Sequence, residues 1–337
     1  MTRVILHIGT EKTGTTSIQH FLSENRQQLL KHGVLYPHIG PRSDAHFDLV
    51  NALHPLDNNG RRMEFLPPVT HDDDYYWNAL SACIEDNRDK TIILSAEHFS
   101  SRLKNNALGY IRDFFDKLDI KPEILIYLRP QEEYIESSYS TAIKSGSHQT
   151  FEQVMKQYQR QPHRYNYSIL LALWGDFFGQ EKICVFPYQK EVIGKDIRLH
   201  FMTFLGIHAI DDFLLPNKIL NKKWDCSTLE LARMLNHPNL GLNKQQRELL
   251  LNRFRPLLAE LNIATKKTSL MTTEEVMVVR DFFKDSNALV AKKYLTEHKE
   301  LFTLPVIKND SKLLPPALTK LDLVKLLAAV GLSDEVK

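Results

Sequence analysis

The chain has 337 residues, and its 43 Lys and Arg nearly balance its 41 Asp and Glu, giving a formal net charge of +2. This balance argues against a nucleic-acid coat or a polybasic membrane binder, although a local basic pocket is compatible with it. The three cysteines are widely spaced and no apolar run approaches the roughly 20 residues of a membrane span, so we expect a soluble, cytoplasmic protein.

Four short apolar runs predict buried strands. Each is rich in Ile, Leu or Val without clean polar alternation, which is typical of parallel strands covered on both faces. The runs are residues 4–8, 91–96, 123–128 and 182–186. The first is followed by a helical pattern with Ile18, Phe21, Leu22 and Leu29 on one face, which Gly33 can end. Because strands and helices alternate, we predict a three-layer α/β fold with a central parallel sheet.

Two segments depart from this alternation. Residues 37–75 hold five prolines and many polar side chains, and we interpret them as an insertion near the site that could close over an acceptor. From about Cys226 onward the pattern is helical. We therefore predict a core at residues 1–225 and a helical C-terminal extension at residues 226–337.

The loop after the first strand has the glycine spacing of a phosphate-binding loop. Gly9 and Gly14 stand five apart, between a predicted strand and a predicted helix, where backbone N–H groups and the positive helix end face an anion. An ATP-binding loop needs Lys after the second glycine, whereas this chain has Thr15 there and Lys12 inside the loop. The loop therefore suits a diphosphate-like group without a γ-phosphate or an obligatory metal. The alternative is an ordinary glycine turn before a helix.

A second anion site is predicted at the end of the third run. Arg129 lies just past that strand, where open α/β sheets bind ligands, and Ser137 follows eight residues later. An Arg fork and a Ser hydroxyl can hold a phosphate together. The alternatives are that Arg129 pairs with Glu132 or Glu133 on the surface, and that Ser137 is a solvated helix position.

Together these motifs resemble a known family. The stretch "HIGTEKTGTTSIQ" is similar to the 5′-phosphosulfate loop of the sulfotransferases that use PAPS (3′-phosphoadenosine 5′-phosphosulfate), and "LRPQEEYIESSY" resembles their 3′-phosphate motif. The resemblance extends over residues 1 to about 210 and is nearest to a bacterial branch in the spacing of Gln131, Ser137, Tyr139, Lys144 and Gly146. It implies transfer of a sulfuryl group from PAPS to a hydroxyl or amine acceptor, with release of PAP and without a metal.

The same resemblance assigns roles to the site residues. Lys12 is expected at the oxygen that bridges sulfur and phosphorus, and Arg129 with Ser137 at the 3′-phosphate. The loop residues expected to bind the nucleotide are Gly9, Thr10, Lys12, Thr13, Gly14, Thr15, Thr16 and Ser17. Glu97 and His98 end the second apolar run, where the family places its base. We favour Glu97, and the alternative is that Glu97 pairs structurally with a loop Arg.

The sequence also departs from the family pattern. Glu11 replaces the proline often found before the loop lysine, which puts an acid beside an anion site. The usual C-terminal Arg-Lys-Gly loop is not evident; Lys222 or Lys223 could substitute, but a solvated Lys pair is the simpler interpretation.

Three functions compete on these grounds. A PAPS-dependent sulfotransferase acting on a glycan or a small molecule is favoured, with a carbohydrate as the expected acceptor. A P-loop kinase of a small metabolite lacks its GK[ST] motif here, and a non-catalytic nucleotide-binding module would not need Lys12 and Glu97. We expect no nucleic-acid partner and no membrane span, and we make no prediction about the oligomeric state.

Overall fold

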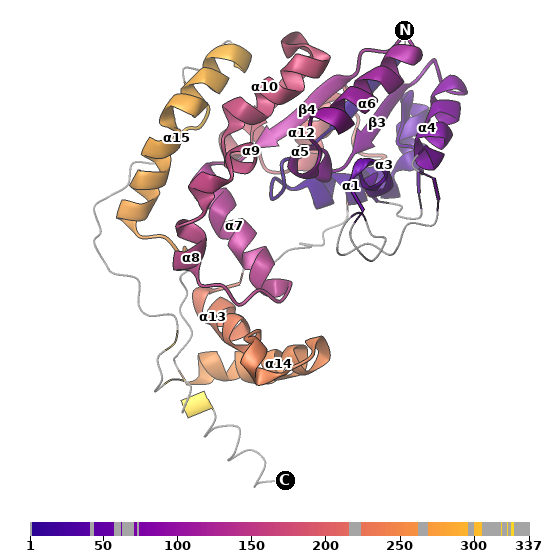
Figure 1. Cartoon of the computed structure of the whole chain (residues 1–337). Coiled ribbons are helices and arrows are strands. Elements are labelled where there is room, and N and C mark those ends of the chain that lie inside the picture. The colour runs from indigo at the N-terminus through magenta and orange to yellow at the C-terminus, as the bar shows by residue number, and fades with distance from the viewer. Residues whose placement is uncertain are drawn as a thin grey trace. The chain divides into compact units, whose positions relative to one another are not determined.

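A computed structural model of the chain is shown in Figure 1. It describes residues 2–40, 44–56, 62, 71–72, 74–215, 224–261, 269–295, 300–304, 318, 322 and 325–326. By contacts the chain divides into two compact units, each built from segments that are separate in sequence. The first unit comprises Met1–Pro130, Pro162–Lys218 and Asp285–Thr303, and the second comprises Gln131–Gln161, Ile219–Lys284 and Leu304–Lys337. The predicted division into residues 1–225 and 226–337 stays a prediction.

The first unit is built on one five-stranded parallel sheet in the order β2-β3-β1-β4-β5. The strands are β1 (Arg3–His7), β2 (Val34–Leu35), β3 (Thr91–Ser95), β4 (Glu123–Leu128) and β5 (Ile183–Pro187). The predicted parallel α/β fold is confirmed, and the four apolar runs are β1, β3, β4 and β5. Strand β2 was not predicted, because two residues at a sheet edge leave no apolar run to recognise.

Helices cover both faces of this sheet. In the first unit they are α1 (Thr15–Glu24), α2 (Arg26–Lys31), α3 (Phe47–Leu53), α4 (Tyr75–Glu85), α5 (His98–Arg102), α6 (Asn105–Lys117), α9 (Pro162–Tyr165), α10 (Tyr167–Phe178), α11 (Lys190–Ile193) and α12 (Ile197–Phe204). On one face, Ile5 and Tyr127 of the strands join a buried cluster with Phe21 of α1 and Phe201 of α12. Alternate strand residues such as Leu6 point to the other face, where α6 packs on α10 and α10 contacts β5.

The single helix predicted to reach Gly33 is two helices, which is a correction to the sequence analysis. The break lies at Asn25, which is buried and donates from Nδ2 to the carbonyls of Phe21 (2.8 Å) and Leu214 (3.0 Å). Its Oδ1 accepts from the Leu214 N–H at 2.8 Å. An Asn side chain that bonds backbone groups competes with helix continuation, and here it also holds a distant segment.

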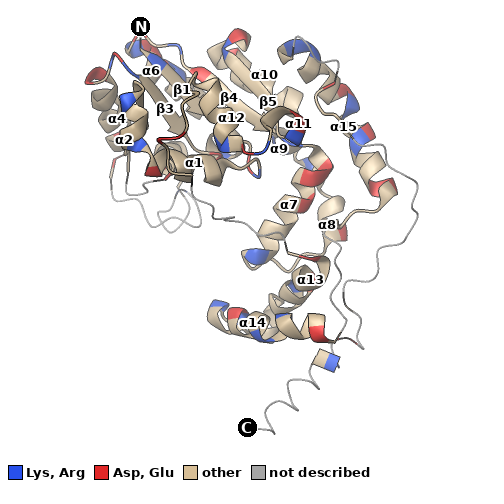
Figure 2. Cartoon of the chain, turned by 180° about the vertical axis from the view of Figure 1, so that it is seen from behind, with Lys and Arg blue, Asp and Glu red and all other residues tan. Residues whose placement is uncertain are grey.

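The second unit is helical. It contains α7 (Gln131–Lys144), α8 (Phe151–Met155), α13 (Cys226–Leu235), α14 (Lys244–Glu260) and the part of α15 (Thr273–Tyr294) up to Lys284. Two apolar clusters hold it together, one around Tyr139 and Leu229 and the other around Leu231 and Phe254. Basic and acidic residues are interspersed along α14 and α15 (Figure 2). Within the described ranges, every helix is too short or too polar to cross a bilayer.

Candidate anion-binding and acid–base site

The predicted site residues of the first unit lie at the carboxyl edge of its sheet. Strand β1 is central, with β3 on one side and β4 on the other, so the chain changes direction across the sheet at β1. Open α/β sheets bind ligands outside the strand ends at such a switch point. The glycine loop follows β1, Glu97 and His98 follow β3, and Arg129 follows β4. The topology therefore brings three segments that are distant in sequence to one edge.

The first half of the loop is fastened to β4. The Thr10 N–H and hydroxyl both donate to the Tyr127 carbonyl, at 2.9 and 3.1 Å, and the Tyr127 N–H donates to the Gly9 carbonyl at 2.7 Å. The Thr13 hydroxyl donates to the Thr10 carbonyl at 2.6 Å. Thr10 and Thr13 are both buried, so their hydroxyls serve the shape of the loop rather than reaching outward.

The second half of the loop opens α1. Gly14 has φ 79°, and its carbonyl accepts from the N–H groups of Ser17 (2.9 Å) and Ile18 (3.1 Å). The first N–H groups of a helix have no intrahelical partner, so those of Thr15 and Thr16 can serve an anion at the positive helix end. The Thr15 side chain is buried and the Thr16 side chain is exposed. The predicted role of these residues in nucleotide binding stays a prediction.

Arg129 contacts the glycine loop directly. Its Nη1 donates to the Lys12 carbonyl at 3.1 Å, and its guanidinium lies 5.8 Å from the centre of the Tyr188 ring. The Tyr167 hydroxyl donates to the Arg129 carbonyl at 2.5 Å and fixes the backbone there. Lys12 itself adopts the left-handed conformation with φ 66°, and its side chain is partly buried. Lys12 and Arg129, the two predicted cations, are thus joined by this hydrogen bond.

Ser137 lies in α7, in the second unit, where its carbonyl accepts from the Thr141 hydroxyl at 3.1 Å. Arg129 belongs to the first unit, so the predicted joint role of Arg129 and Ser137 stays a prediction. Glu132, one of the two acids considered as a partner of Arg129, forms an ion pair with Arg280 at 2.7 Å. Lys222 and Lys223 lie outside the described residues.

Glu97 packs against the loop. A Cβ atom at Gly9 would stand 3.1 Å from the Cα and Cβ of Glu97, and Gly9 has φ 105°, so only glycine allows this approach. The Glu97 carboxylate accepts from Gln19 Nε2 at 2.9 Å. This bond to an amide of α1 differs from the pairing with a loop Arg that we considered as the structural alternative.

Lys12 and His98 both lie near the carboxylates of Glu11 and Glu97. Burial lowers the pKa of Lys12, although the nearby Glu11 and Glu97 act in the opposite direction. Burial likewise lowers the pKa of His98, whose ring meets that of Phe47 with 4.8 Å between centres. A neutral His98 can accept a proton, and the choice between Glu97 and His98 as the base stays a prediction.

Glu11, the unexpected acid of the loop, has a partner within the chain. Arg164 Nη2 donates to its Oε2 at 2.9 Å, and the Glu11 side chain is 14% exposed. Burial alone would raise the pKa of Glu11, but Arg164, the Ser101 hydroxyl, His98 and Lys12 together lower it. The acid therefore faces a cation of α9. Sequence analysis missed Arg164, because a helix of four residues far along the chain carries no local signal.

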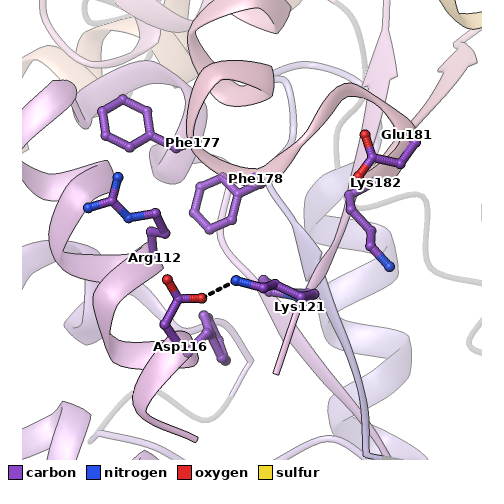
Figure 3. A pocket seen from close by; sticks show the side chains of 9 residues that line it. Arg112, Asp116, Lys121, Phe177, Phe178, Glu181 and Lys182 are labelled. Atoms are coloured by element: carbon purple, nitrogen blue, oxygen red, sulfur yellow. Dashed lines mark hydrogen bonds and ion pairs between the residues drawn. The ribbon is translucent and has the colours of Figure 1, made fainter. Parts of the chain in front are cut away.

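Other features of the chain lie apart from this edge. A cavity of about 280 Å³ lies beside the amino ends of β4 and β5. Figure 3 shows its wall, with Phe178 and an ion pair between Asp116 and Lys121. The three cysteines are all free thiols. In the part of the chain that the structure describes, no three His, Cys, Asp or Glu side chains are grouped to hold a metal.

Comparison with known proteins finds likenesses among the solved structures. No protein-family model and no curated protein matches this chain. The crystal structure of a sulfotransferase from Alicyclobacillus acidocaldarius is similar over 71% of this chain and 96% of the solved chain, with 15% sequence identity and a TM-score of 0.41.

Proposed function

We propose that this protein is a PAPS-dependent sulfotransferase that transfers a sulfuryl group to a hydroxyl or amine, with a carbohydrate as the favoured acceptor. One observation carries the proposal. Three features converge at the carboxyl edge of the sheet: the glycine loop that opens α1, the Arg129 guanidinium bonded to that loop, and Glu97, whose Cα and Cβ pack on Gly9. An anion cradle, a cation and a base are the groups that sulfuryl transfer needs.

The chemistry assigns each group a task. As in phosphoryl transfer, the moving group passes through a loose transition state with the attacking and leaving oxygens in line. The acceptor oxygen forms a bond to sulfur while the bond from sulfur to the bridging oxygen breaks, and PAP leaves with the negative charge. Lys12 stabilises that charge, and Glu97 takes the acceptor proton.

The nucleotide is held at two ends in this proposal. The N–H groups of Thr15 and Thr16 bind the 5′-phosphate at the helix end. Arg129 binds the 3′-phosphate, which distinguishes PAPS from ATP. We also propose a cytoplasmic location, which the three free thiols favour.

Ligand-dependent thermal stability tests the nucleotide. PAP without metal should raise the melting temperature, since a ligand at 100 times its Kd adds about 2.7 kcal/mol to the unfolding free energy. Lys12→Ala and Arg129→Ala should remove most of this shift. Lys117→Ala, an exposed position at the end of α6, is the matched control and should retain it. If only ATP with Mg²⁺ stabilises the chain, the proposal fails and a kinase is favoured.

Mass spectrometry of glycan acceptors incubated with PAPS tests the reaction. A mass gain of one sulfuryl group should appear in the acceptor and be lost in Glu97→Gln. If Glu97→Gln keeps full activity and His98→Gln loses it, His98 is the base. Binding of PAP without sulfation of any acceptor would favour a non-catalytic module.

A further inference from the structure

Gln19 is buried, and its side-chain amide nitrogen donates hydrogen bonds to two acceptors within the chain. It lies in the second turn of α1 and is 3% exposed. Its Nε2 donates to Glu97 Oε2 at 2.9 Å and to Ser95 Oγ at 3.3 Å. Leaving a buried polar group without partners costs about 1–3 kcal/mol, so these two acceptors set the direction of the amide.

Ser95 is itself held by a buried network. Its hydroxyl lies 2.8 Å from His7 Nδ1, and its N–H donates to His46 Nδ1 at 3.0 Å. Because His46 accepts at Nδ1, its neutral ring carries the proton on Nε2, which donates to the Pro37 carbonyl at 2.9 Å. His7, Ser95 and His46 are all at most 2% exposed. The Ser95 hydroxyl, which accepts a hydrogen bond from Gln19, is therefore held in a fixed position.

We propose that Gln19 is a positioning residue that holds the Glu97 carboxylate at the glycine loop. A donor aimed at one carboxylate oxygen leaves the second oxygen to meet the hydroxyl or amine that receives the sulfuryl group. The inference rests on the proposed function, because it gives Gln19 a role only if Glu97 is the base.

Helix α1 then contributes both to nucleotide binding and to the placement of the base. Its first turn presents N–H groups at the loop, and Gln19, five residues after Gly14, fixes the base. One rigid helix thus sets the distance between the nucleotide and the base, which is the positioning on which the rate depends.

Gln19→Met tests the inference, because Met has a similar shape and no donor. We expect kcat to fall about 10- to 100-fold, as for a reacting group displaced by about an ångström, while the Kd for PAP changes less than twofold. Gln27→Met, the same exchange at an exposed position of α2, should leave both unchanged.

A double-mutant cycle separates positioning from general damage. If Gln19 acts through Glu97, Gln19→Met should cost nothing further in the Glu97→Gln background. Equal losses in both backgrounds would overturn the positioning role while the sulfotransferase proposal stands. Full activity of Glu97→Gln would remove the base and this inference together. If Gln19→Met does not fold, Ser95→Ala frees the Gln19 amide from its second acceptor and should give a smaller loss of kcat. That loss should vanish in the Glu97→Gln background, and an equal loss in both backgrounds would refute the inference.

Discussion

Two buried histidines should make the fold sensitive to mild acid. His7 is 0% exposed and His46 is 2% exposed, and both lie in the network behind Gln19. Burial lowers the pKa of His7 to about 3 and that of His46 to about 4, from an ordinary value near 6.5. Both rings are therefore neutral in the folded chain at pH values where the unfolded chain is already protonated.

The sign and size of the effect follow from proton linkage. Above pH 6.5 neither state binds these protons, so the histidines do not change the stability. Below pH 6.5 the unfolded state binds more protons, and the unfolding free energy falls by about 1.4 kcal/mol per pH unit for each ring. Over the two units from pH 6.5 to 4.5, the two rings together remove about 5 kcal/mol, which is comparable with the whole stability of many domains.

Urea unfolding between pH 7.5 and 4.5, at constant ionic strength, measures this slope. The fluorescence of Trp77 and Trp174, both buried in the first unit, can report it. His46→Asn keeps an acceptor for the Ser95 N–H and cannot titrate, so it should halve the slope. His208→Gln, at an exposed position, should leave the slope unchanged. A slope that is flat in the parent chain, or equal in the parent and His46→Asn, would refute the reasoning.

Three further substitutions test the loop and the break in the first helix. Glu11→Gln removes the acid that lies 2.9 Å from Arg164. Because a negative charge that repels the anionic ligand is lost, we expect calorimetry to show PAP binding at least about threefold tighter. Weaker binding would mean that the ion pair shapes the site. Gly14→Ala should lower the unfolding free energy by about 1–2 kcal/mol in urea melts, because φ is 79° there; an unchanged melt would contradict this. Asn25→Ala should cost about 2–3 kcal/mol in the same assay, because the backbone of Leu214 loses its partners, and a loss under 0.5 kcal/mol would count against the tether.

The sequence predicts the parts of this fold that are local and repetitive. Apolar runs give β1, β3, β4 and β5, and Gly9 and Gly14 mark the loop because a backbone with positive φ favours glycine. What the sequence cannot indicate is pairing across the chain. The break at Asn25 depends on a partner 189 residues away, and an Asn in a helical pattern looks the same without that partner.

The same limit applies to the candidate site. Arg129 and Glu97 were predicted because each directly follows an apolar strand, and parallel strands end at one edge. Gln19 and Arg164 were missed, since neither follows a strand and each acts through a side chain from another segment. A residue at a strand end is marked in the sequence by the apolar run before it. A residue that supports it from another segment is recognised only once the helices are in place.

In the proposed function, the position of Lys12 accounts for the absence of the lysine of an ATP-binding loop. With φ 66°, Lys12 turns its carbonyl toward Arg129, which donates to it at 3.1 Å. The cation proposed for the 3′-phosphate therefore also supports the backbone of the cation proposed for the bridging oxygen. Loss of Arg129 should then weaken both ends of nucleotide binding, whereas two independent phosphate sites would lose only one. In the proposed function the two anchors then act as one unit, which ties recognition of the nucleotide to placement of the group that moves.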